Sequence, residues 1–186
     1  MDTLVESLFN AMHEQLKKSS RMLAFVQARV SAESFVRNEC ALAACDLLDP
    51  QRYRLEMERR HQGKTIDLLI YETEDGIHKK EPAYQFELKM AWPGGLPGNA
   101  AGVRHDLDAL QGRNNAWALV LFFAFETADE GVRYQPTGVG LEEGLGKFVE
   151  QVNAGPLQWI GPPFPMLFGK SVGKACLMAW PPATPP

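Results

Sequence analysis

Three charged residues interrupt apolar segments of this sequence, and their types and spacing suit metal-dependent hydrolysis. Asp67 is the only charge within the apolar run 65–71, and Glu87 and Lys89 stand two residues apart in a second run at 83–90. Residues two apart in a strand point to the same side, so the glutamate and the lysine share a face. Two carboxylates held close together repel each other, and such a cluster needs a compensating cation.

A hard divalent ion is the cation that such a cluster favours. Mg²⁺ or Mn²⁺ prefers carboxylate and carbonyl oxygens and keeps several waters in an open site. Lys89 supplies one positive charge, and the ion would supply the rest. A lysine beside the ion can orient or deprotonate an attacking water, while the ion stabilises charge on a phosphate. The cluster therefore predicts hydrolysis of a phosphodiester.

Three strands are expected to bring these residues together. Apolar and charged residues alternate over 53–58, which is typical of a strand with one exposed face. The runs 65–71 and 83–90 are also rich in strand-forming residues, and Asp75-Gly76 between them is a turn signal. We therefore expect an antiparallel meander with Asp67 on its second strand and the glutamate and lysine on its third.

Helices are expected before this meander. Apolar residues recur three and four apart over 2–18, which indicates one face of a helix. A second helix is predicted at 22–29, and Ser31 could cap a third that runs to about Leu48.

A crossover unit is expected after the meander. The proline- and glycine-rich segment 93–98 favours a loop, 101–110 a helix, and the nearly all-apolar 116–125 a strand covered on both faces. Weaker signals follow at 141–153 for a helix, at 157–160 and 172–180 for strands, and at 181–186 for an extended tail.

This order of elements and charges resembles the PD-(D/E)XK, or restriction-endonuclease-like, nucleases. Their core is a helix, a meander with Asp on the second strand and Glu-x-Lys on the third, then a helix and another strand. The resemblance covers roughly residues 31–125, although Ile66 stands where the family name has proline. It implies an α/β fold with a central mixed sheet flanked by helices. The domain division expected is a single domain over 1–186, with a helical extension at 1–30, a nuclease-like core at 31–125, a C-terminal elaboration at 126–180 and a tail at 181–186.

The resemblance also implies roles for individual residues. Asp67, Glu87 and the backbone carbonyl of Leu88 would bind Mg²⁺ or Mn²⁺, and Lys89 would be the catalytic lysine. Glu33 matches a glutamate that the family often adds from its first core helix. On that helix Glu33 shares the face of apolar residues, namely Val36, Cys40, Ala43, Ala44 and Leu47. It could equally be an acid that stabilises the first turn of the helix.

Substrate contacts have weaker signals. Arg59, Arg60 and Lys64 could grip phosphates beside the cluster, but a solvated hairpin explains them equally well. Arg104 could border the site, although Arg104 and Asp106 fit a solvated helix face better. The expected substrate is nucleic acid, DNA rather than RNA, and many nucleases of this kind act as homodimers.

A different class of function stays open. The chain has 186 residues and a formal charge of −4, which argues against a wholly electrostatic nucleic-acid binder and leaves room only for a local basic groove. The alternative is a catalytically inactive protein on the same fold that binds another protein, as an immunity or regulatory partner does. The acids and the lysine would then be ordinary surface charges.

Composition sets the expected cellular setting. The three cysteines show no C-x-x-C spacing, which predicts neither a zinc site nor disulfides and favours a reducing environment. The N-terminus carries acids where a leader would carry bases, and no apolar run approaches the length of a membrane span. We therefore expect a cytoplasmic protein without a membrane partner.

Overall fold

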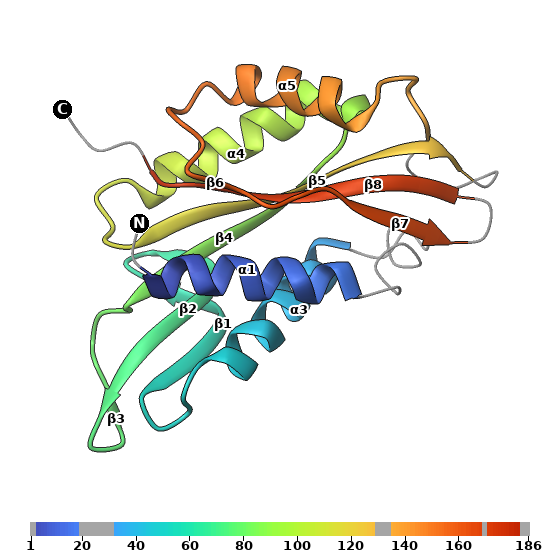
Figure 1. Cartoon of the computed structure of the whole chain (residues 1–186). Coiled ribbons are helices and arrows are strands. Elements are labelled where there is room, and N and C mark those ends of the chain that lie inside the picture. Colours follow the sequence, from blue (N-terminus) through green and yellow to red (C-terminus); the bar gives the residue numbers. More distant parts are fainter. Residues whose placement is uncertain (1–2, 19–31, 129–134, 169–170, 183–186) are drawn as a thin grey trace.

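An open mixed sheet forms the centre of the fold (Figure 1). The computed structural model describes residues 3–18, 32–128, 135–168 and 171–182. The helices are α1 (Thr3–Lys18), α3 (Ala32–Leu47), the 3₁₀ turn η1 (Pro93–Gly95), α4 (Leu96–Leu110) and α5 (Leu141–Val152). The strands are β1 (Tyr53–His61), β2 (Lys64–Glu74), β3 (Ile77–His78), β4 (Tyr84–Ala91), β5 (Ala116–Thr127), β6 (Trp159–Ile160), β7 (Phe164–Phe168) and β8 (Ser171–Trp180).

The strand order is β1-β2-β4-β5-β8-β6, with β3 beside β2 and β7 beside β8. The pairs β1–β2 and β2–β4 are antiparallel, so the predicted meander is confirmed. The pair β4–β5 is parallel, and α4 lies on the crossover between these two strands. The remaining pairs are antiparallel. This is the mixed sheet expected of the α/β class.

Helices cover both faces of the sheet, with α1 and α3 on one side and α4 and α5 on the other (Figure 1). The first core joins α1 and α3 to inward side chains such as Phe86 and Leu88 of β4. The second joins α4 and α5 to β5 residues such as Val120 and Phe122. Because β5 is covered on both faces, the continuous apolar run of this strand is buried from Ala116 to Phe125, as its sequence predicts.

Two segments differ from the sequence prediction because they contain proline. The predicted loop at 93–98 is wrong from Leu96 onward, where α4 already begins with Pro97 in its first turn. A first-turn residue has no helical partner for its N–H, so proline costs little there. Strand β7 was not expected at all. It contains Pro165, which an outer strand tolerates because one side of it makes no ladder hydrogen bonds.

The N-terminal helix belongs to the main core. Its buried face, which includes Phe9 and Met12, packs with α3 and the sheet. The end of α3 corrects one expectation, because Leu47 is 42% exposed and Leu48 takes the buried position. The predicted helix at 22–29, the Ser31 cap and residues 183–186 of the tail lie outside the described residues.

The cysteines and the helices bear on two further expectations. All three cysteines are free: Cys40 and Cys176 are buried and Cys45 is exposed. Within the described part of the chain, no helix combines the length and the apolar character needed to cross a membrane.

Candidate active site

The candidate site lies where strands β2 and β4 stop pairing. Their ladder ends at Leu68 and Phe86, so Asp67 and Glu87 are the next residues on the two strands. The Asp67 carboxylate replaces the missing ladder partner, because its Oδ2 accepts a hydrogen bond of 2.8 Å from the backbone N–H of Leu88. This fork between the strands positions both acids.

The carboxyl groups of Asp67 and Glu87 lie within hydrogen-bond reach of each other. Burial raises the pKa of Glu87 to about 8, and the charge of Asp67 and a hydrogen bond with it add to the shift. Asp106 acts in the same direction, whereas Lys89 opposes it. A hydrogen bond between two carboxyls needs a proton on one of them. The two acids therefore meet on one side of the sheet, as a shared ion would require.

Lys89 lies between acids from two helices. Its Nζ is 3.2 Å from Oε1 of Glu33 on α3 and 3.4 Å from Oδ2 of Asp106 on α4. Burial favours the neutral amine, but Asp106 and Glu33 outweigh it and raise the pKa of Lys89. Gly102 on α4 lies beside this side chain, and a Cβ there would make only an ordinary van der Waals contact, 3.9 Å from Cε of Lys89.

A second cation, Arg37 on α3, contacts Asp67 and a further acid on β1. Its Nη1 lies 2.7 Å from Oδ1 of Asp67 and 2.7 Å from Oε1 of Glu58 on β1. Its Nη2 donates a hydrogen bond of 3.0 Å to Oγ of Ser34, one helical turn earlier. Three elements thus hold the guanidinium, which is only 12% exposed.

The sequence-predicted residues separate into those at the fork and those elsewhere. Asp67, Glu87, Lys89 and Glu33 come together there. Asp106 joins them and is 13% exposed, so its interpretation as part of a solvated helix face is wrong. Burial raises the pKa of Asp106, and Lys89 partly offsets that shift.

Arg104 points elsewhere, although it is only two residues before Asp106. It is exposed and donates through Nη1 to the backbone carbonyl of Gln151 on α5. Residues that stand two positions apart on a helix point in different directions. Arg104 therefore lies against α5. Among the described residues, it makes no hydrogen bond or ion pair with the acids at the fork.

The other predicted phosphate contacts lie on the β1–β2 hairpin. Arg60 stands opposite Thr65, and Lys64 stands opposite His61 at the end of the ladder. Arg59 forms an ion pair with Glu56, with 3.5 Å between Nε and Oε2. All three basic side chains are exposed to solvent beside the strand that carries Glu58.

Sequence reasoning missed Arg37 and Glu58, although both have a signal. Arg37 follows Glu33 by four positions, so the two share a helical face. Glu58 stands opposite Asp67 in the register between the pairs Met57–Leu68 and Arg59–Ile66. Cross-strand neighbours share a face of the sheet. The helical spacing of Arg37 is visible in the sequence, whereas the position of Glu58 opposite Asp67 becomes visible only once the register is known.

The donor set suits a hard divalent ion. Two carboxylates are the usual number of protein ligands for Mg²⁺, which keeps waters and takes carbonyl oxygens such as that of Leu88. A cation bound between these two acids would offset their mutual repulsion. Among the described residues, no group of three or more His, Cys, Asp or Glu side chains is already arranged to hold an ion.

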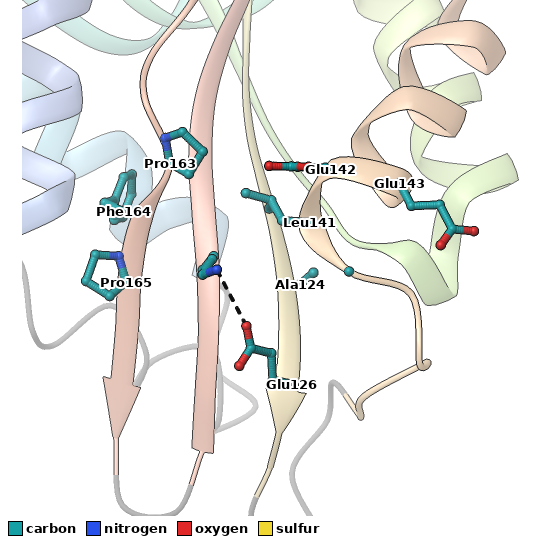
Figure 2. A pocket seen from close by; sticks show the side chains of 10 residues that line it. Ala124, Glu126, Leu141, Glu142, Glu143, Pro163, Phe164 and Pro165 are labelled. Atoms are coloured by element: carbon teal, nitrogen blue, oxygen red, sulfur yellow. Dashed lines mark ion pairs between the residues drawn. The ribbon is translucent and has the colours of Figure 1, made fainter.

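A separate pocket lies between the start of α5 and strands β5, β7 and β8 (Figure 2). Its volume is about 670 Å³, and Leu141 and Phe164 supply apolar lining. Figure 2 shows Glu126 at the pocket. Its Oε1 lies 3.8 Å from Nζ of Lys174, and both side chains are exposed. The pocket shares no lining residue with the acids at the β2–β4 fork.

Comparisons with known proteins assign no family. The chain matches no protein-family model, no curated protein and no solved structure. The class that the fold defines is an α/β protein with a large, open mixed sheet flanked by helices. The restriction-endonuclease-like assignment stays a prediction from the sequence.

Proposed function

We propose that this protein is a metal-dependent nuclease that hydrolyses phosphodiester bonds of nucleic acid. The observation that carries the proposal is the placement of Asp67 and Glu87 directly after the last pair of the β2–β4 ladder, with Lys89 two residues further along β4. Two acids and a lysine at the end of a strand ladder are the groups that phosphodiester hydrolysis needs. The fork leaves them partly open to solvent, where a substrate can reach them.

Asp67, Glu87 and the carbonyl of Leu88 would hold the divalent ion. When bound, Mg²⁺ or Mn²⁺ supplies Lewis-acid stabilisation of negative charge on the scissile phosphate. The chain fixes one ligand in advance, because the backbone N–H of Leu88 donates to Oδ2 of Asp67 and so orients this carboxylate. A ligand held in place loses little freedom when the ion arrives.

Lys89 acts as a positioned cation. Glu33 and Asp106 keep its ammonium charged and fix its direction. An ammonium can orient an attacking water by hydrogen bonding and can stabilise charge that develops on the phosphate. Glu33 and Asp106 are then positioning residues that act through the lysine.

A second candidate function is favoured by Arg37. Its guanidinium already neutralises Asp67 at 2.7 Å, so this acid has a counter-ion within the chain. A protein that uses this fold only to bind a protein partner would need no other cation there. The acidic net charge of −4 agrees with this alternative.

Cleavage assays separate the two functions. Plasmid DNA, single-stranded DNA and RNA are each incubated with the full chain and Mg²⁺ or Mn²⁺. The same assays are run on Asp67→Asn, which retains a hydrogen-bonding side chain, and on Lys89→Ala. Lys147→Ala on α5 is the matched control, because within the described part of the chain the ion pair of Lys147 is with exposed Glu143 of the same helix, at 2.6 Å.

The nuclease proposal expects ion-dependent cleavage that both site variants lose and the control retains. Calorimetry with Mn²⁺ should show binding that Asp67→Asn weakens. Absence of cleavage on all three substrates, together with absence of ion binding, would contradict the nuclease and favour the protein-binding alternative.

A further inference from the structure

Three acids form a row across neighbouring strands at the fork. Glu58 of β1, Asp67 of β2 and Glu87 of β4 occupy successive cross-strand positions. Arg37 lies between the first two, with 2.7 Å from its Nη1 to each carboxylate. A cation bound by Asp67 and Glu87 would occupy the neighbouring place in this row.

The two partners of Arg37 differ in their surroundings. The side chain of Asp67 is 17% exposed and that of Glu58 is 65% exposed. The backbone of Glu58 has φ of +49°, a left-handed conformation that costs free energy in any residue other than glycine. This residue interrupts the ladder between the pairs Met57–Leu68 and Arg59–Ile66. The residue with this irregular backbone, Glu58, is the one whose carboxylate contacts Arg37.

From this arrangement we propose that Arg37 competes with the divalent cation for Asp67, and that Glu58 holds Arg37 when the cation binds. The inference rests on the proposed function, because it assigns a regulator to the same ion site. A guanidinium and a divalent ion that share the Oδ1 atom of Asp67 repel each other. Ion binding therefore requires Arg37 to move from Asp67, and the exposed Glu58 is already in contact with it.

The test measures Mn²⁺ affinity by calorimetry on the full chain and does not depend on activity. Arg37→Gln should bind Mn²⁺ at least tenfold more tightly than the wild-type chain. Glu58→Gln should bind it several-fold more weakly, because Arg37 then has only Asp67 as an acidic partner. In the Arg37→Gln background, the effect of Glu58→Gln should shrink to less than twofold.

Two further variants keep the test sharp. Arg37→Lys retains the positive charge but not the guanidinium that bridges the two acids, so it should bind Mn²⁺ less tightly than Arg37→Gln. If Arg37→Gln fails to fold, the weaker binding expected of Glu58→Gln remains the test, and unchanged affinity in Glu58→Gln would overturn the inference. Arg54→Gln is the matched control, since Arg54 on β1 pairs with Glu56 at 3.2 Å and has no contact with Asp67 among the described residues. Its affinity should equal that of the wild-type chain.

The outcomes distinguish the inference from the function on which it rests. Equal Mn²⁺ affinity in the wild-type chain and Arg37→Gln overturns the competition and leaves the nuclease proposal standing. An effect of Glu58→Gln that is as large without Arg37 as with it overturns the role of Glu58, because the effect would then be long-range charge alone. Absence of Mn²⁺ binding in the wild-type chain and in every variant overturns both proposals.

Discussion

The Nζ atom of Lys89 on β4 lies 3.2 Å from Oε1 of Glu33 on α3, across a separation of 56 residues in sequence. This contact joins α3 to the fork between β2 and β4. Among the described residues, two cations, Arg37 and Lys89, share the fork with five acidic side chains: Glu33, Glu58, Asp67, Glu87 and Asp106. The excess of acid is the physical reason that we expect a further cation to bind there.

Lys89→Met tests the charge balance at the fork. The variant keeps the length of the side chain but leaves Asp106 buried without its cation. We expect Mg²⁺-dependent cleavage to fall at least about 100-fold. In EDTA, the free energy of unfolding should fall by about 1 to 3 kcal/mol. Urea denaturation measures this change, and exposed Lys147→Met should change stability by less than about 0.5 kcal/mol. An unchanged cleavage rate would show that the lysine has no role in the reaction.

Asp106→Asn tests whether this residue acts through Lys89. Asp106 raises the pKa of the lysine, so its loss should let Lys89 deprotonate at lower pH. If the ammonium is the active form, the alkaline limb of the pH–rate profile should shift to lower pH, with a rate loss of about tenfold at neutral pH. A merely structural role would lower the rate without moving the limb. Asp108→Asn is the exposed control on the same helix.

Glu87→Gln tests the shared proton of the acid pair. The unfolded chain releases the Glu87 proton near the ordinary pKa of 4.5, whereas the folded chain retains it to about pH 8. The unfolded state then binds fewer protons, so the free energy of unfolding falls as pH rises from 4.5 to 8. The glutamine has no such proton. In EDTA at pH 9, we expect the variant to be more stable than the wild-type chain by at least about 1 kcal/mol.

Two measurements complete this test. Urea denaturation at pH 5 should show a smaller difference between the two chains than at pH 9. Glu150→Gln on α5 controls for the loss of one exposed charge. Equal pH dependence in Glu87→Gln and the wild-type chain would mean that the acid pair does not share a proton.

The local pattern was enough to predict where the acids of the strands lie. Strand alternation places Glu87 and Lys89 on one side, and a turn signal places Asp67 beside them. Helical periodicity likewise predicts that Glu33 points toward the sheet. These are relations within one element or between neighbours in the chain, and simple geometry determines them.

The remaining features depend on tertiary structure. Whether Asp106 meets solvent or Lys89 depends on how α4 crosses the sheet, and its helical position alone does not reveal this. Arg37 contacts Asp67 at the point where the β2–β4 ladder ends, and this contact depends on how α3 packs on the sheet. The predictions at the two prolines were wrong for the same reason. Pro97 is tolerated because it lies in the first turn of α4, and Pro165 is tolerated because it lies in an outer strand.

His13 on α1 predicts a loss of stability in acid. Its ring is buried against Trp159 and Phe164, and neither ring nitrogen has a hydrogen-bond partner within the described chain. Burial lowers the pKa of His13, Glu14 opposes this shift and Lys17 adds to it. The unfolded chain therefore binds a proton below pH 6.5 that the folded chain resists, so stability falls as pH drops through this range. His13→Leu should lose part of this pH dependence in urea denaturation between pH 7 and pH 5, whereas exposed His78→Gln should retain it. Identical pH dependence in His13→Leu and the wild-type chain would mean that protonation of His13 does not oppose the packing of α1.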